Sequence, residues 1–163
     1  MPVGTGRHTV GTIGAESGLA PTVSGTDRTW HYLTMPFSKR VEIRWADMDA
    51  FRHVNNATYL SYLEEVRDEW LVARIGAEAT TAFVLARVAI DYRSSVTQDD
   101  DEVEVSLELV RVGRSSVTTR ELVVVPHDGR LAAEADAVLV HVDWTTGAAI
   151  PIDDGLRAAL TAG

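Results

Sequence analysis

The first regular pattern of apolar and polar positions begins near Phe37. Val41, Ile43 and Trp45 alternate with charged residues. A period of two is typical of a strand with one buried face, because successive side chains point to opposite sides. The pattern predicts a strand that runs from about Phe37 through Trp45 into the Asp-Met-Asp sequence at 47–49.

The spacing of apolar residues then changes to three and four, which predicts an amphipathic helix over residues about 56 to 75. The positions that follow this spacing are Tyr59, Leu60, Leu63, Val66, Trp70 and Leu71. Asn55 or Asn56 can cap the start of this helix, and Gly76 suits the left-handed residue after its end.

Four more strand-like runs follow, each rich in β-branched residues and alternating in polarity. They cover residues 83–93, 102–112, 115–125 and 131–143, and a short helix is expected at about 153–161. The connections carry turn signals, such as Gly113-Arg114 and His127-Asp128-Gly129. These runs are too close together for crossover helices. We therefore expect an α+β domain in which one long helix covers one face of an antiparallel sheet.

Residues 1–34 show neither the two-residue alternation of a strand nor the three- and four-residue spacing of a helix. They hold half of the chain's 12 glycines, spread among Thr, Ser and Ala. Such a composition is typical of disorder. We expect 1–34 to be a disordered tail or an extension upstream of the true start, and 35–163 to form the folded domain.

Composition and charge narrow the classes of function. A chain of 163 residues fits one domain, and a net charge of −9 argues against a nucleic-acid partner. The absence of cysteine excludes disulfides, thiolate metal sites and a cysteine nucleophile. No apolar run is long enough for a membrane span, and no signal-peptide pattern is present. We therefore expect a cytoplasmic protein with no membrane partner.

Candidate chemistry concentrates on the loop that joins the first predicted strand to the long helix. Its polar residues are Asp47, Asp49, His53, Asn55 and Asn56. Backbone N–H groups at a helix start lack helical acceptors and favour an oxygen that gains negative charge. A carboxylate beside such an oxygen can act as a base or as a nucleophile. The same residues are also ordinary turn and cap residues, and the residue types alone leave both interpretations open.

The loop sequence resembles a known family. The signature of hotdog-fold thioesterases of the 4-hydroxybenzoyl-CoA thioesterase type is an apolar strand, then D-x-D-x-x-G-x-V, then Asn or an aromatic residue that opens the long helix. The resemblance covers roughly 37–152 and includes IDYRSSVTQDDDEVEV and RVGRSSVTTRELVV. Plant acyl-ACP thioesterases carry a similar D-x-D-x-x-x-H-V-N-N run. The resemblance implies a hotdog fold, one long helix wrapped by a five-stranded antiparallel sheet, and hydrolysis of an acyl-CoA or acyl-ACP thioester.

The resemblance also implies roles for single residues. The second aspartate of D-x-D, Asp49, corresponds to the catalytic carboxylate, and the N–H of Asn56 corresponds to the group that polarises the thioester carbonyl. In a second branch of hotdog thioesterases the carboxylate is a helical glutamate, which corresponds to Glu64. We favour Asp49, because D-x-D is intact whereas the H-G-G of the second branch is replaced by residues 55–57.

Two residues depart from the pattern. Arg52 stands where the bacterial family usually has glycine, and it can narrow the acyl entrance or replace a backbone conformation with positive φ. Phe51 stands where the plant enzymes have asparagine, so their catalytic assignment is not transferred in full to His53. His53 is a candidate for an acid–base or substrate-orienting role, with a packed loop histidine as the alternative.

The substrate implied by the resemblance includes coenzyme A, which is a polyanion. Candidate phosphate contacts are Arg93, Arg111 and Arg114, the last beside Ser115. Tyr59 is a candidate for lining the acyl pocket. No other cofactor is implied, and the histidines show no metal-ligand spacing, so we expect no metal. The resemblance also implies a homodimer or homotetramer, and edge pairing of sheets would remove an exposed strand.

Ordinary structural roles remain the alternative for several of these residues. The tryptophans and tyrosines of 45–70 are expected mainly in the core, and Glu64 can form a helical pair with Arg67. The acidic run at 99–101 suits a hydrated hairpin tip.

Other functions are also open or excluded. A non-catalytic acyl-binding module is the rival function, and Arg52 is the feature that would support it. The chain lacks the D-x-N-P-x-H spacing of a hotdog hydratase and the G-x-S-x-G motif of a serine hydrolase, so neither function is expected.

Overall fold

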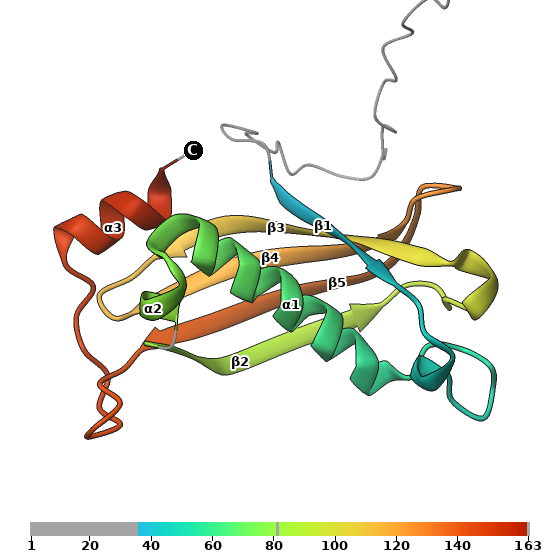
Figure 1. Ribbon diagram of the computed structural model, residues 1–163, viewed down its shortest axis with the longest axis horizontal. Coiled ribbons are helices and arrows are strands. Elements are labelled where there is room, and N and C mark those ends of the chain that lie inside the picture. The colour runs from blue at the N-terminus through green and yellow to red at the C-terminus, as the bar shows by residue number, and fades with distance from the viewer. Residues whose placement is uncertain (1–35, 81, 163) are drawn as a thin grey trace, which may run out of the picture.

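A computed structural model describes residues 36–80 and 82–162, which form an antiparallel sheet with one long helix across one face (Figure 1). The strands are β1 (Phe37–Glu42), β2 (Phe83–Tyr92), β3 (Glu102–Val112), β4 (Ser116–Val125) and β5 (Arg130–His141), and the helices are α1 (Asn56–Ile75), α2 (Ala77–Thr80) and α3 (Asp154–Thr161). The strand order β1-β3-β4-β5-β2 makes β1 and β2 the two edges. The predicted α+β architecture is confirmed. The proposed tail at 1–34 lies outside the described residues.

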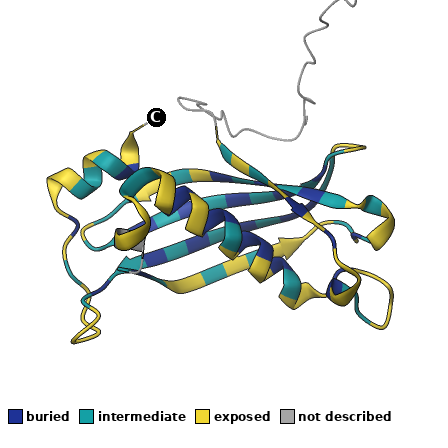
Figure 2. Cartoon of the chain, viewed as in Figure 1, coloured by how far each residue is buried: buried dark blue, intermediate teal, exposed yellow. Residues whose placement is uncertain are grey.

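The central strands β3, β4 and β5 form a meander in which buried residues alternate with less buried ones over most of its length (Figure 2). Their bounds agree with the predicted runs to within one or two residues. The pairing shifts by one residue at Leu85/Arg87 in β2 and at Leu109/Arg111 in β3. Such bulges bend a strand and increase its twist.

The long helix has the predicted start and end. Asn55 is the N-cap, and its side-chain oxygen accepts a hydrogen bond of 2.9 Å from the Ala57 amide. Gly76 follows the helix with φ of 83°. The side of α1 that faces the sheet buries Tyr59, Tyr62, Leu63, Val66, Arg67, Trp70 and Leu71.

One residue of that buried face is charged. Arg67 is 3% exposed and donates to Glu121 of β4 over 2.7 Å, and Glu121 is fully buried. The hydroxyl of Thr119 donates to the other carboxylate oxygen of Glu121 over 2.8 Å. Burial raises the pKa of Glu121, and the charge of Arg67 acts against that rise. The expected surface pair between Glu64 and Arg67 is therefore wrong, because Arg67 points into the core.

The structure departs from the predicted elements at two places. The strand β1 ends at Glu42, three residues before Trp45, because its partner β3 begins opposite that residue at Glu102. Trp45 instead opens a 3₁₀ turn and is 79% exposed, so its expected place in the core is also wrong. The short helix α2 was not predicted.

Candidate active site

The loop between β1 and α1 is anchored by Asp47, whose side chain is buried. Its carboxylate accepts hydrogen bonds from the Arg44 amide (2.8 Å), the Arg44 guanidinium (3.0 Å) and the Tyr62 hydroxyl of α1 (2.7 Å). Its backbone carbonyl accepts the Asn55 amide over 2.8 Å. The first aspartate of D-x-D therefore fixes the loop to the helix.

These bonds also set the charge state of the anchor. Burial alone would raise the pKa of the Asp47 carboxyl, but the hydrogen bonds from Arg44 and Tyr62 outweigh burial and hold this pKa below its usual value. Burial, and then the bond to Asp47, raise the pKa of Tyr62 well above its usual value. Asp47 is thus a stable anion and Tyr62 a stable donor.

The second aspartate, Asp49, is held by its own loop through one carboxylate oxygen. Oδ1 accepts the backbone amides of Phe51 (2.8 Å) and His53 (3.1 Å). The Asp49 amide donates to the His53 carbonyl over 2.8 Å, and the Arg52 amide donates to the Asp49 carbonyl over 3.1 Å. Within the described ranges, Oδ2 has no hydrogen-bond partner. One oxygen orients the carboxylate, and the other is left for a ligand.

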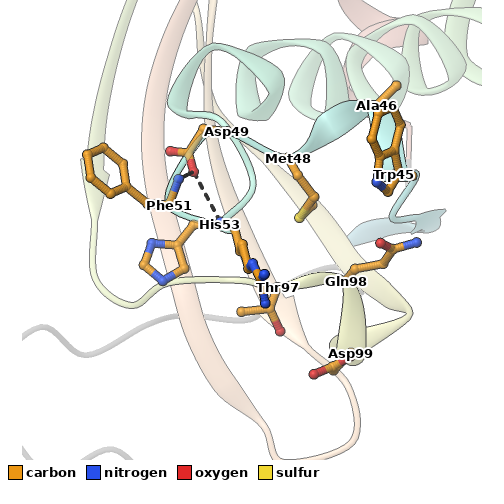
Figure 3. A pocket seen from close by; sticks show the side chains of 10 residues that line it. Trp45, Ala46, Met48, Asp49, Phe51, His53, Thr97, Gln98 and Asp99 are labelled. Carbon is orange, nitrogen blue, oxygen red and sulfur yellow. Dashed lines mark hydrogen bonds between the residues drawn. The ribbon is translucent and has the colours of Figure 1, made fainter.

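Asp49 lines a cleft of about 680 Å³ at the helix N-terminal end of the sheet. The lining residues are Trp45, Ala46, Met48, Asp49, Phe51, Arg52, His53, Thr97, Gln98 and Asp99. Figure 3 shows Asp49, Phe51 and His53 on one side, with Trp45, Gln98 and Asp99 across from them. Trp45 and Phe51 are 79% and 80% exposed. The cleft lining thus combines two carboxylates, an imidazole and two exposed aromatic rings.

The helix start lies next to this loop. Because Asp47 bonds to Asn55 and Met48 pairs with Val54, the chain returns along itself to the first residue of α1, Asn56. The Asn56 amide has no acceptor among the residues that the structure describes, as expected of a first helical residue. The Tyr92 hydroxyl of β2 donates to the Asn56 carbonyl over 2.8 Å and fixes the helix start against the sheet edge. Asn56 itself is exposed beside the cleft and is not part of its lining.

The backbone at Arg52 has the positive φ that was expected because the bacterial family usually has glycine at this position. Its φ is 63°, in the left-handed region that favours glycine, and its side chain lines the cleft. The arginine therefore adopts the positive φ that a glycine takes readily.

Several other residues singled out from the sequence lie apart from the cleft. Tyr59 is buried beneath Tyr92, with ring centroids 5.2 Å apart, and burial raises its pKa to about 12. Glu64 is exposed on α1 and does not line the cleft. Arg93 forms ion pairs with Glu134 and with Asp91 (3.2 Å). The charge of Arg93 is thereby compensated within the chain.

Arg111, Arg114 and Ser115 lie at the other end of the sheet. The lining residues Thr97, Gln98 and Asp99 come just before the start of β3. Arg111 lies at the end of β3, and Arg114 and Ser115 lie in the turn to β4. Figure 1 shows these two ends of β3 at opposite ends of the sheet. An 11-residue strand spans roughly 30 Å at about 3.3 Å per residue. A single copy of the described chain does not bring these residues to Asp49.

One wall of the cleft was missed by sequence reasoning. Thr97, Gln98 and Asp99 reach the cleft because the Val96 carbonyl accepts the Val54 amide over 2.8 Å. The neighbouring Asp100 was expected at a hydrated tip, but its side chain is largely buried and binds Arg130 over 2.7 Å. The acidic run signalled a turn, but no local pattern indicates which distant segment it contacts.

No helix in the described part of the chain is long and apolar enough to cross a membrane. Over residues 36–80 and 82–162, no three His, Asp or Glu side chains are placed to hold a metal ion.

Comparison with known proteins identifies the family. The model of the Thioesterase-like superfamily matches residues 43–160. The long-chain acyl-CoA thioesterase FadM of Escherichia coli is 26% identical over 130 residues, which cover 74% of this chain and 94% of FadM. A Thermus thermophilus thioesterase, solved with coenzyme A and Zn, is 35% identical with a TM-score of 0.68 over 76% of this chain and 90% of that one. The 1,4-dihydroxy-2-naphthoyl-CoA thioesterase Slr0204 of Synechocystis, at 15% identity and a TM-score of 0.67 over 77% of this chain and 96% of that one, shares the fold.

The fold, the D-x-D loop and the family match agree. The five-stranded antiparallel sheet with its long helix is the hotdog thioesterase fold. The matched segment contains the whole loop and the cleft. The chain belongs to the thioesterase-like superfamily and is a thioester hydrolase.

Proposed function

We propose that this thioester hydrolase cleaves acyl-CoA thioesters with Asp49 as its catalytic carboxylate. The observation that carries the proposal is that the two oxygens of this side chain differ. Two backbone amides hold Oδ1, while Oδ2 has no hydrogen-bond partner among the described residues and the side chain lines the cleft. The names of FadM and of the coenzyme A complex support an acyl-CoA substrate. The intact D-x-D run supports the 4-hydroxybenzoyl-CoA thioesterase type, and the cysteine-free composition supports a cytoplasmic location.

Two routes start from the same geometry. In the first, Asp49 takes a proton from a water molecule as that water attacks the thioester carbon, and the proton leaves with the thiolate. In the second, Oδ2 attacks the carbon, thiolate departs to give a mixed anhydride, and water then opens the anhydride. Both routes consume one water and release one carboxylic acid and one thiol.

The negative charge that develops on the carbonyl oxygen needs a donor. The Asn56 N–H is suited to this role, because it lies at the positive end of α1 and has no acceptor among the described residues. His53 lines the cleft beside Asp49 and is suited to orienting the substrate or to passing a proton to the leaving sulfur. Glu64 is the weaker candidate for the carboxylate, because it lies outside the cleft lining.

The test is thiol release from a panel of acyl-CoAs with short, long and aromatic acyl groups, followed with a thiol dye. Asp49→Asn is expected to lower kcat by two to four decades, because a positioned base contributes about 100- to 10,000-fold. The amide is nearly the same size and can still accept the two backbone bonds, so the loop is expected to keep its shape.

Asp68→Asn is the matched control, because Asp68 is an exposed helical carboxylate outside the cleft. It is expected to keep the wild-type rate. A loss confined to Glu64→Gln, with Asp49→Asn fully active, would contradict the assignment. Flat traces from the wild-type protein across the whole panel would favour the rival function, a non-catalytic acyl-binding module.

We also propose that the chain acts as a homo-oligomer, at least a dimer. Edge strand β2 exposes the large apolar residues Leu85 and Tyr92, and its outer side pairs with no strand of the described sheet. If two copies pair antiparallel through β2, the far end of one sheet lies next to the cleft end of the other. Arg111, Arg114 and Ser115 would then serve the cleft of the partner.

A further inference from the structure

Arg52 is a charged residue in a conformation that costs free energy for any side chain. Its φ of 63° lies in the left-handed region, where glycine is favoured and where arginine is rarely found. The one other non-glycine residue with positive φ in the described ranges, Asp101, does not line the cleft. Non-glycine residues held in such conformations concentrate at ligand-binding and catalytic sites. The position of Arg52 therefore invites a functional explanation.

Among the residues that the structure describes, the guanidinium of Arg52 has no partner. Among the described residues no carboxylate forms an ion pair with it, and no hydrogen bond of its side chain is present. By contrast, the nearby Arg44 is bound to Asp47. Arg52 lines the same cleft as Asp49 and is exposed there. It is thus a cation at the cleft whose charge the described part of the chain does not compensate.

The chemistry of the side chain indicates what it binds. A guanidinium presents parallel N–H donors that match two oxygens of a carboxylate or a phosphate. The cleft lining already carries the carboxylates of Asp49 and Asp99, and the chain carries a net charge of −9. An anionic ligand would be repelled from this surface unless a cation compensates it locally. Arg52 is placed to supply that compensation.

We propose that Arg52 is a specificity-determining residue that binds a pair of anionic oxygens on the substrate, an inference that rests on the proposed thioesterase function. The Arg52 amide bonds to the Asp49 carbonyl, so the two residues end one tight turn, with α-carbons within about 7 Å. This short distance favours a carboxylate carried on the acyl chain near the thioester. The diphosphate of coenzyme A, which the pantetheine arm separates from the sulfur, is the other source of the same chemistry.

The test uses two matched pairs of ligands. Glutaryl-CoA and pentanoyl-CoA differ by a terminal carboxylate on the acyl chain. Pentanoyl-CoA and S-pentanoyl-pantetheine differ by the phosphates and nucleotide of the carrier. Values of kcat/KM are measured for the thioesters, and Kd is measured for the corresponding non-hydrolysable thioethers, so that binding is scored even without turnover.

The wild-type protein is expected to prefer the more anionic member of at least one pair by about 10- to 100-fold, the range for a hydrogen bond to a charged group. Arg52→Gln and Arg52→Gly are expected to abolish this preference to the same extent, and Arg52→Lys to keep part of it. If the variants lose the preference within the first pair, the anion that Arg52 binds is on the acyl chain. If they lose the preference within the second pair, the anion is on the carrier.

Gln keeps a side chain at the left-handed position, whereas Gly removes it, so a markedly different selectivity of the two variants would assign the effect to the backbone and overturn the proposal. A preference that is absent from the wild type, or unchanged in both variants, would overturn it as well. If no thioester is hydrolysed but the thioether preferences follow Arg52, the hydrolytic function fails and the anion site stands.

Discussion

Asp47 and Asp49 are two residues apart and have different tasks. The carboxylate of Asp47 is buried and bonded through both oxygens, whereas one oxygen of Asp49 has no partner in the described part of the chain and that residue lines the cleft. The sequence motif predicted two carboxylates on a loop before a helix, but it could not assign the anchor. That assignment depends on Tyr62, which lies 15 positions from Asp47.

Replacement of Asp47 by asparagine tests this anchor through the pH dependence of stability. The pKa of the folded-state carboxyl lies below its unfolded value, so its contribution to the free energy of unfolding is fully present above about pH 4 and is lost as pH falls through the folded-state pKa. The free energy of unfolding of the wild type, measured by urea titration, should therefore fall more steeply below about pH 4 than that of Asp47→Asn.

Tyr62→Phe removes one of the donors and should give an intermediate slope. Parallel curves for wild type and Asp47→Asn would show that the carboxylate makes no such contribution.

The backbone at Arg52 gives a second prediction at this scale. Arg52→Gly should raise the free energy of unfolding by up to about 1 kcal/mol, because the left-handed conformation costs a side chain about 1–2 kcal/mol and the greater freedom of glycine in the unfolded chain offsets part of the gain.

Gly129→Ala is the opposite substitution, because it adds a side chain at a residue whose φ is 70°. No atom lies close to the new methyl group, so the backbone conformation alone should lower the free energy of unfolding, by about 1 kcal/mol. If thermal unfolding shows both substitutions destabilising to the same degree, the conformational argument for Arg52 is wrong.

At the scale of elements, most of the secondary structure could be predicted and most of the contacts between elements could not. Alternation located the strands because each buries one face, and Asn55 and Gly76 bounded the helix because caps and left-handed ends have their own residue preferences. The same alternation extended β1 wrongly to Trp45. The strand β1 ends at Glu42 because its partner β3 begins opposite it at Glu102, 60 residues along the chain.

No local sequence pattern predicts the contact between α1 and β4 through Arg67 and Glu121, which are 54 residues apart. Removal of one partner of a buried ion pair leaves an uncompensated charge and typically costs about 3–5 kcal/mol, whereas replacement of both by apolar residues is often neutral. Arg67→Met should therefore destabilise by about 3–5 kcal/mol, and the double variant Arg67→Met/Glu121→Leu by much less.

A double-mutant cycle in urea, completed by Glu121→Leu, checks this expectation. Additive effects of the two single substitutions would mean that the buried pair is not coupled in the folded protein.

For the whole molecule, the fold class and the location of the candidate site could be predicted because the D-x-D loop and the helix start are adjacent in the chain. The far wall of the cleft could not be predicted, since Thr97, Gln98 and Asp99 reach it through the hydrogen bond from the Val54 amide to the Val96 carbonyl, which joins segments distant in the sequence. For the candidate phosphate contacts Arg93, Arg111 and Arg114, the sequence likewise did not indicate which arginine lies near the cleft. The fold places Arg111 and Arg114 far from the cleft and engages Arg93 with two carboxylates.

The proposed assembly is tested by the mass of the particle in solution. Light scattering should give at least twice the 17.7 kDa of the chain. Leu85→Arg places a charge on the outer edge strand and should shift the mass toward one chain, because burying an unpaired charge at an interface is costly.

Thr118→Arg is the control, because Thr118 lies on the interior strand β4 and is only partly buried. A wild-type mass of one chain, or an unchanged mass for Leu85→Arg, would contradict pairing through β2.

The bonds that direct the Asp49 side chain all lie within the loop: the amides of residues 51 and 53 hold its oxygen, and Asp47 closes the loop on Asn55. Within the described residues, support from outside the loop includes the Tyr62 hydroxyl and the Val96 carbonyl. A segment whose own hydrogen bonds set its conformation can be transferred as a unit between related proteins. Chimaeras that exchange residues 44–56 between members of the superfamily should thus inherit the proposed catalytic carboxylate in the same orientation, together with whichever side chain the donor has at position 52.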